Sequence, residues 1–325
     1  MRYTLKDCFA VKDVETTYGT NKSYFTLTSS EDSKVIRDNK DQLVGVSSCT
    51  PFACGNLDPS KTLEGIPVGG SSSGSVLDLL QGRCDYSIGS DVGGSCRTPA
   101  VRAGIFGLKG TKESIPVQGM YSCCSSLESV GIMAKELITL KKAFLNSGVD
   151  HHNSWKKEKV IQGPLVEKED VQGAWFAKYL PQFFSNSMVF NGLHHRFPPR
   201  GYKSTFSKRS TAGRDSLPPI VKCRILAGAR LALKDPKDLR KQSIEKFLSI
   251  LNHKYPEDTL IVTPVDPLGV RRKSDFDDSY LLLANLLDRP SLVLPWGGTG
   301  LQLIGPKGSE VKLISYAEKL ISHKY

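Results

Sequence analysis

Two serine- and glycine-rich segments constrain this chain more than any other feature. The first covers Val68–Ser75 (VGGSSSGS) and the second covers Gly89–Ala100 (GSDVGGSCRTPA). A flexible linker is the ordinary interpretation of such a composition, but apolar stretches flank the first segment closely and leave no spacer. A phosphate-binding loop is also excluded, because the terminal Lys-Ser/Thr of that motif is missing. We therefore expect ordered turns that carry serine chemistry.

The nucleophile elbow of α/β hydrolases is one such turn, and Gly70–Gly74 formally fits its GxSxG pattern. That elbow needs a strand that leads directly into the serine, and Pro67 lies where a central strand needs a hydrogen-bond donor. The elbow also needs a histidine. The six histidines lie in polar stretches without an evident orienting partner: His151, His152, His194, His195, His253 and His323. The elbow is therefore disfavoured.

Serine chemistry without histidine needs another base, because a serine hydroxyl is a poor nucleophile until its proton is removed. A buried lysine can serve, since burial lowers the pKa of its ammonium and makes the neutral amine available. A second serine can relay the proton. Glycines beside the nucleophile let successive backbone N–H groups converge on an oxyanion, and Val92–Ser95 supplies such a turn.

Composition excludes several other classes of protein. The 325 residues, 39% of them hydrophobic, suffice for one or two domains with a buried core. No apolar stretch approaches the roughly 20 residues of a membrane span, so we expect no such span. None of the eight cysteines forms a CxxC pair, which disfavours a disulfide scaffold or a structural zinc site. The net charge of +11 fits a solvated surface, or a protein that works near RNA or in an organelle with basic proteins.

Hydrophobic periodicity predicts alternating strands and helices at both ends of the chain, and hence an α/β fold with a mixed or largely parallel sheet. Between His151 and Pro219 the pattern weakens, and we expect an irregular excursion there. The predicted helices cover Ser30–Gln42, Val76–Leu80, Glu136–Asn146, Ile220–Leu233, Pro236–Asn252 and Glu310–Ser322, and the predicted strands cover Leu43–Val46, Tyr86–Ile88, Gly104–Leu108, Leu260–Thr263, Ser291–Leu294 and Leu301–Ile304.

Three linked segments, Gly69–Ser75, Gly89–Ala100 and Gly104–Thr111, resemble the amidase signature family. The resemblance implies one α/β domain over residues 1–325, with a mixed, mostly parallel sheet covered by helices on both faces and residues 149–219 as the excursion. It also implies a Ser–Ser–Lys triad. In that triad Ser95 is the acylated nucleophile and Ser71 is the bridging serine, held by a cis peptide. The family's oxyanion-hole positions correspond to Val92, Gly93 and Gly94.

Two lysines compete for the third place in the triad, because Lys6 and Lys12 are both followed by aspartate, as in the family's Lys-Asp dipeptide. The family has a threonine-containing turn about ten residues later. Lys6 places Thr16-Thr17 and Gly19 there without a gap, whereas Lys12 places Lys22-Ser23 there. We therefore favour Lys6 and keep Lys12 as the alternative.

The chain resembles one branch of the family, the A subunits of glutamyl-tRNA(Gln) amidotransferase, and within that branch a compact mitochondrial form such as yeasts have. Further segments carry this resemblance. They are Ser125–Gly131, Val221–Gly228, Ala284–Pro295 and Gly300–Gly305. The resemblance implies free glutamine as substrate, with Arg224 for its carboxylate and Asp278 for its ammonium group. A tyrosine that orients glutamine in the family falls near Phe183, which has no hydroxyl.

The implied reaction is glutamine hydrolysis, with the ammonia passed to a B subunit that converts Glu-tRNA(Gln) to Gln-tRNA(Gln). The implied partners are that B subunit and a small third subunit, with ATP and Mg²⁺ used by the partner and no cofactor in this chain. The implied location is the mitochondrial matrix, with the cytoplasm as the alternative. Only five residues precede Lys6, which suggests a compact form or a truncated gene model. A stand-alone amidase and a catalytically inactive amidase-like scaffold remain as alternative functions.

Overall fold

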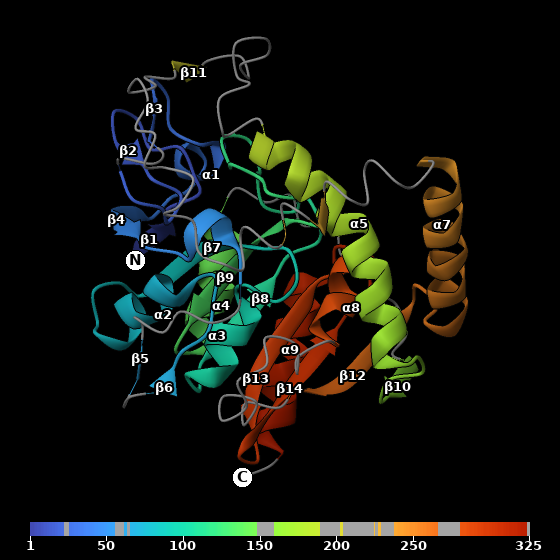
Figure 1. Ribbon diagram of the computed structural model, residues 1–325. Helices are drawn as coiled ribbons and strands as arrows, with labels where there is room; N and C mark the ends of the chain where they lie inside the picture. The colour runs from blue at the N-terminus through green and yellow to red at the C-terminus, as the bar shows by residue number, and fades with distance from the viewer. Residues whose placement is uncertain are drawn as a thin grey trace.

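A computed structural model describes residues 1–22, 26–55, 62–63, 66–147, 159–188, 202–203, 224, 227–228, 237–265 and 280–323. Their main feature is a nine-stranded sheet in the order β10-β12-β14-β13-β8-β9-β7-β1-β4 (Figure 1). Its strands are β1 (Arg2–Lys6), β4 (Gln42–Ser47), β7 (Tyr86–Asp91), β8 (Phe106–Lys109), β9 (Ser129–Ala134), β10 (Lys159–Gln162), β12 (Thr259–Val265), β13 (Ser291–Trp296) and β14 (Thr299–Ile304). Smaller sheets combine β2 (Glu15–Thr16), β3 (Leu27–Ser29) and β11 (Tyr202–Lys203), and β5 (Thr62–Leu63) with β6 (Ile66–Pro67).

The large sheet is mixed. Strand β1 pairs in parallel with β4 and β7, and β10 pairs in parallel with β12. The other described neighbours pair antiparallel. The β13–β14 pair shows how an antiparallel pair arises. A tight turn through Gly297 and Gly298, both with positive φ, reverses the chain directly between the two strands. The predicted α/β fold with a mixed sheet is confirmed, although among the described strands of this sheet antiparallel pairs outnumber the parallel pairs that were expected to predominate.

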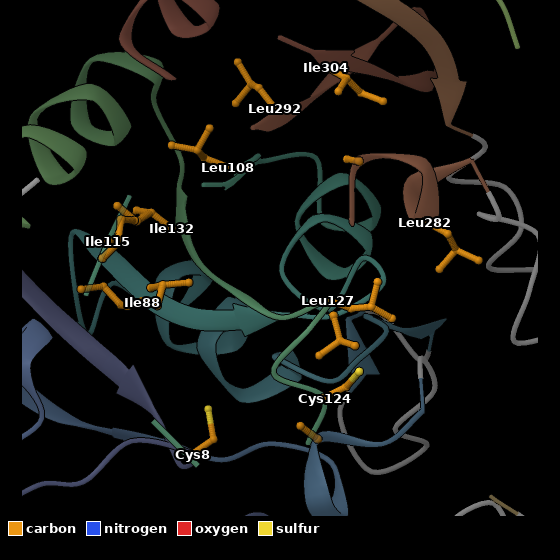
Figure 2. Packing of buried hydrophobic residues seen from close by; sticks show 14 of the residues in the cluster. Cys8, Ile88, Leu108, Ile115, Cys124, Leu127, Ile132, Leu282, Leu292 and Ile304 are labelled. Carbon is orange, nitrogen blue, oxygen red and sulfur yellow. The ribbon is translucent and has the colours of Figure 1, made fainter. Parts of the chain in front are cut away.

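Helices cover both faces of the sheet. Neighbouring residues of a strand point to opposite faces, and Ile132 and Met133 of β9 accordingly belong to two different core clusters. Met133 packs with helices α2 (Ser73–Leu80) and α3 (Arg97–Arg102). Ile132 packs in the larger cluster of Figure 2, with residues of α4 (Leu137–Asn146) and α9 (Glu310–Ser322). The other helices are α1 (Lys34–Arg37), η1 (Pro51–Ala53), α5 (Lys168–Met188), α7 (Lys237–Lys254) and α8 (Leu281–Leu286).

Helix α5 corrects the prediction of an irregular segment between 151 and 219. Its buried side chains Val171, Trp175, Tyr179 and Phe183 recur every four residues, which is a helical period. The helix even contains Pro181, which lacks a backbone donor and weakens the sequence pattern of a helix. No described helix has the length and apolar character that a membrane crossing requires.

Several predicted elements are confirmed, including the helices near 136–146 and 310–322 and the strands near 43–46, 291–294 and 301–304. The helix predicted over 30–42 is wrong, because α1 is confined to Lys34–Arg37 and β4 begins at Gln42. Strand β9 was missed. All six of its residues are buried, so it lacks the alternation of a half-exposed strand. The helix predicted over 220–233 lies mostly outside the described residues.

Candidate active site

The parallel pairing of β1 and β7 places the carboxyl ends of both strands at one edge of the sheet. Leu5 lies opposite Ile88, so Lys6 at the end of β1 reaches the residues that close β7. The Lys6 Nζ donates to Ser90 Oγ at 3.2 Å and lies 3.5 Å from the Ser90 carbonyl oxygen. This sheet edge therefore holds a lysine side chain that the fold buries completely.

The lysine meets the first serine segment at Ser71. Lys6 Nζ lies 2.6 Å from Ser71 Oγ, and both side chains are fully buried. The Gly70–Ser71 peptide is cis. Lys12, by contrast, is exposed, and its backbone N–H donates to Asp32 at 2.7 Å. Of the two candidate lysines, the structure brings Lys6 to the serine.

The ionisation of Lys6 depends on its surroundings. Burial lowers its pKa, whereas negative charge on Cys8, Cys49, Cys96 and Glu128 would raise it above the ordinary value. Burial in turn raises the pKa of Cys8 and Cys96 to about 12, so these groups are neutral thiols at pH 7. With these two thiols uncharged at neutral pH, burial, the largest single influence on Lys6, opposes protonation of its amine.

Ser95 lies in the turn between β7 and α3 and is 8% exposed. Its carbonyl oxygen accepts a hydrogen bond from the Ser72 N–H at 3.2 Å, which joins the two serine segments. The N–H of Gly94, one of the predicted oxyanion donors, donates to Asp91 Oδ1 at 2.8 Å and is therefore already used. Among the described residues, no hydrogen bond uses the N–H of Gly93 or Ser95.

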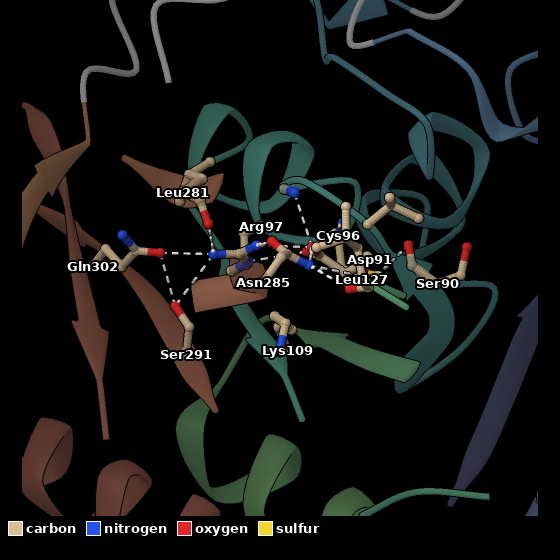
Figure 3. A network of polar contacts seen from close by, with 12 residues as sticks. Ser90, Asp91, Cys96, Arg97, Lys109, Leu127, Leu281, Asn285, Ser291 and Gln302 are labelled. Carbon is tan, nitrogen blue, oxygen red and sulfur yellow. Dashed lines mark hydrogen bonds and ion pairs between the residues drawn. The ribbon is translucent and has the colours of Figure 1, made fainter. Parts of the chain in front are cut away.

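Asp91 anchors this turn to a buried network that the sequence did not indicate (Figure 3). Its carboxylate pairs with Arg97, whose Nη2 lies 2.8 Å from Oδ1 and whose Nε lies 3.0 Å from Oδ2. Burial alone would raise the pKa of Asp91, but the charge and hydrogen bonds of Arg97 hold it well below its usual range. Arg97 also donates to Gln302 Oε1 at 2.7 Å and to Asn285 Oδ1 at 2.6 Å. Both partners come from the last 45 residues of the chain.

Arg224, a predicted substrate residue, is buried and lies over the ring of Tyr179 at 5.5 Å. Its Nη1 donates to the Tyr179 hydroxyl at 3.5 Å. Tyr179 lies one helical turn before Phe183, and their rings stack at 5.2 Å. A tyrosine hydroxyl is therefore present here, four residues before the expected position. The helical period within α5 would have revealed it. Asp278 lies outside the described residues.

The arrangement combines a buried amine, a hydroxyl in contact with it, and a glycine-flanked serine whose segment is hydrogen-bonded to the first. These are the parts needed for acyl transfer by serine with a lysine base. Within the described residues, no group of three His, Cys, Asp or Glu side chains is placed to hold a metal ion.

Comparison with known proteins finds related sequences. A family model described as Amidase matches residues 3–174. The mitochondrial A subunit of glutamyl-tRNA(Gln) amidotransferase from Candida albicans is 22% identical over 373 residues, covering 88% of this chain and 83% of that protein.

Solved structures share the fold. One named as an amidase aligns with a TM-score of 0.77 and 18% identity, over 99% of this chain and 84% of that chain. The glutamyl-tRNA(Gln) amidotransferase A subunit from Thermotoga maritima aligns with a TM-score of 0.65 and 18% identity, over 97% and 81% of the two chains.

Proposed function

Since this chain belongs to the amidase family, we propose that it hydrolyses the side-chain amide of glutamine and supplies the ammonia of a glutamyl-tRNA(Gln) amidotransferase. The observation that carries the proposal is the 2.6 Å contact between Lys6 Nζ and Ser71 Oγ in a fully buried setting. A lysine that only carried charge at the protein surface would not be fully buried against a serine. A general base must lie within hydrogen-bond reach of the proton that it removes, and this distance meets that requirement.

The proposed reaction proceeds through an acyl-enzyme. Ser95 Oγ attacks the amide carbon, its proton passes to Ser71, and the Ser71 proton passes to the Lys6 amine. The amide nitrogen then takes a proton back along the same path, the C–N bond breaks, and ammonia leaves. Water then attacks the ester carbon of the acyl-enzyme and gives up a proton along the same path. The Ser95 oxygen takes a proton back as the ester bond breaks, and glutamate is released. The backbone N–H groups of this turn that Asp91 does not accept, those of Val92, Gly93 and Ser95, would stabilise the oxyanion in both halves of the reaction.

Substrate recognition is proposed to use opposite charges at the two ends of a zwitterion. Arg224 would bind the α-carboxylate, because a guanidinium matches the geometry of a carboxylate. Its position over Tyr179 holds the guanidinium within a buried environment, where such a pair is stronger than in water. Asp278 would take the ammonium group.

The proposed setting is a complex. A B subunit would use ATP and Mg²⁺ to activate Glu-tRNA(Gln) and would receive the ammonia, and a small third subunit would complete the assembly. The Candida albicans relative is named as mitochondrial, and together with the net charge of +11 this supports the mitochondrial matrix as the location.

The proposal is tested by purifying the chain with its native partners and measuring ammonia release from glutamine. We expect Ser95→Ala and Lys6→Ala to abolish release without loss of assembly, and Lys12→Ala to retain it. Full activity of Lys6→Ala would refute the assigned base. Addition of Glu-tRNA(Gln) and ATP to the complex should yield Gln-tRNA(Gln), and its absence would refute the amidotransferase role alone.

A stand-alone amidase is the second candidate, because the structure named simply as an amidase gives the higher TM-score of 0.77. This alternative predicts hydrolysis of a small amide by the isolated chain. It also predicts that Arg224→Met leaves hydrolysis of an uncharged amide unchanged. In the glutamine role, the same substitution should raise KM for glutamine strongly.

A further inference from the structure

The turn that precedes Ser95 is held by two side chains from distant helices. The indole Nε1 of Trp175, in α5, donates to the Val92 carbonyl oxygen at 2.9 Å. The Nδ2 of Asn285, in α8, donates to the Asp91 carbonyl oxygen at 3.0 Å. We infer that Trp175 and Asn285 are positioning residues that orient the backbone N–H groups of Gly93 and Val92 toward the oxyanion. The inference rests on the serine chemistry of the proposed function.

The planarity of the peptide bond links each carbonyl to the N–H that follows it. In a trans peptide unit the C=O and the next N–H lie in one plane and point in opposite directions. When Trp175 holds the Val92 carbonyl, it therefore directs the Gly93 N–H away from α5. When Asn285 holds the Asp91 carbonyl, it likewise directs the Val92 N–H away from α8. The turn presents these donors to the side opposite the two helices.

Packing reinforces these two hydrogen bonds. A β-carbon on Gly93 would lie 2.8 Å from Leu282 and 3.0 Å from the Trp175 ring, so glycine alone allows this close approach. A β-carbon on Gly94, which has φ +110°, would lie 3.0 Å from Leu281. Trp175 and Asn285 are 5% and 2% exposed, and both hydrogen bonds are therefore shielded from water.

The side-chain amide of Asn285 makes further hydrogen bonds, which distinguish it from a residue that only packs. Its Nδ2 also lies 3.1 Å from the Leu127 carbonyl oxygen, and its Oδ1 accepts from Arg97 at 2.6 Å. One amide thus joins the end of β7, the segment before β9, and the first turn of α3 (Figure 3). Both positioning residues lie outside the stretch 3–174 that the family model matches.

The test needs a reaction that reports on the oxyanion and is independent of the natural substrate. A fluorophosphonate serves. Ser95 Oγ forms a bond to phosphorus, the P–F bond breaks, fluoride leaves, and the serine proton passes through Ser71 to Lys6. The phosphonyl oxygen occupies the place of the oxyanion. We would measure the labelling rate in the native complex, together with kcat and KM for glutamine.

Three variants and one control separate orientation from folding. Trp175→Phe removes the indole N–H, and site-specific 3-benzothienylalanine at 175 replaces that N–H by sulfur in a ring of nearly equal size. Trp296→Phe is the matched control, because it makes the same change at a partly buried tryptophan elsewhere. Asn285→Asp tests the second bond, since it keeps the acceptor for Arg97 and replaces the donor to Asp91 by an oxygen; because that oxygen faces the Asp91 carboxylate, the thermal midpoint of this variant is measured as well.

Removal of one oxyanion donor costs about 10²–10³-fold in kcat, and loss of orientation should cost less. We expect labelling and kcat to fall about 10-fold in both position-175 variants and in Asn285→Asp, with KM within 2-fold and the thermal midpoint of the benzothienyl variant unchanged. Trp296→Phe should label at the wild-type rate.

Wild-type labelling rates in the benzothienyl variant would overturn the inference, as would a wild-type chain that is not labelled at Ser95. A wild-type chain that is labelled but does not hydrolyse glutamine would refute the proposed substrate. The orientation of the turn would still be decided by the labelling rates of the variants.

Discussion

The substitution Asp91→Asn tests the buried network most directly, because both oxygens of Asp91 accept hydrogen bonds and neither donates. Oδ1 accepts from Gly94 N–H at 2.8 Å, from Arg97 Nη2 at 2.8 Å and from Asn285 Nδ2 at 3.3 Å. Oδ2 accepts from Cys96 N–H at 3.2 Å and from Arg97 Nε at 3.0 Å. An asparagine must place an NH₂ group at one of these positions, where it faces donors.

The magnitude follows from that count of donors. The asparagine amide lowers the stability least when its NH₂ takes the place of Oδ2, where Cys96 N–H and Arg97 Nε lose their acceptor. Each buried group left unsatisfied costs about 1–3 kcal/mol, and more when it is charged. Loss of the negative charge also leaves the Arg97 guanidinium unpaired, and breaking a buried ion pair costs about 3–5 kcal/mol. We expect Asp91→Asn to lower the free energy of unfolding by about 3–5 kcal/mol.

The assay is urea unfolding of the wild type, Asp91→Asn, Arg97→Met and the double variant. The two side chains are in direct contact, so the cycle should be strongly non-additive, with the double variant less destabilised than the sum of the single changes. The pKa of Asp91 is held below its usual range. The ion pair therefore stabilises the fold fully above the unfolded-state pKa of about 3.9 and less as pH falls through the folded-state value. Asp91→Asn should lose less stability on acidification than the wild type.

Two results would refute this account. Additivity of the Asp91 and Arg97 substitutions would mean that the pair does not act as a unit. A loss below about 1 kcal/mol in Asp91→Asn would mean that the amide finds partners that the geometry does not provide.

Three further predictions concern the site itself. Lys6→Arg should abolish ammonia release, since arginine keeps the charge but is not deprotonated in proteins; retained activity would show that Lys6 contributes only charge. Tyr179→Phe should raise KM for glutamine several-fold with little change in kcat, because Arg224 loses the hydroxyl that it contacts, and steady-state kinetics will decide between this and an unchanged KM. Gly93→Ala should lower kcat at least 10-fold, because its β-carbon would lie 2.8 Å from Leu282, and an active variant with a wild-type melting temperature would contradict the close packing.

The part of the site that lies in short, recognisable segments was accessible from sequence. Ser71 and Ser95 stand in glycine-rich segments whose composition signals special backbone conformations, and the structure gives the Gly70–Ser71 peptide as cis. Lys6 could be located because a threonine turn follows at a fixed spacing. Asp7 accepts hydrogen bonds from that turn, including the Thr17 hydroxyl at 2.6 Å. These features are local, so local patterns reveal them.

Contacts between distant parts of the chain were not accessible. Nothing in the residues around Trp175 indicates that its N–H reaches Val92, because that contact depends on how α5 lies across the end of β7. Strand β9 was missed because burial on both faces removes its alternation. The Gly94 N–H was predicted to bind the oxyanion, but Asp91, three residues earlier, accepts it instead.

The order of strands explains why the site needs both ends of the chain. Strand β13 inserts beside β8, and β14 follows it in the sheet. Ser291 and Gln302 thereby come within 3.4 and 2.7 Å of Arg97 Nη1, although 194 and 205 residues separate them from it in sequence. A buried guanidinium needs its acceptors in place at once, because each missing partner leaves a charged donor in an apolar interior. The turn that carries Ser95 is therefore held, through Asp91 and Arg97, by side chains of the C-terminal strands and α8, which ties the geometry of the nucleophile to the far end of the chain.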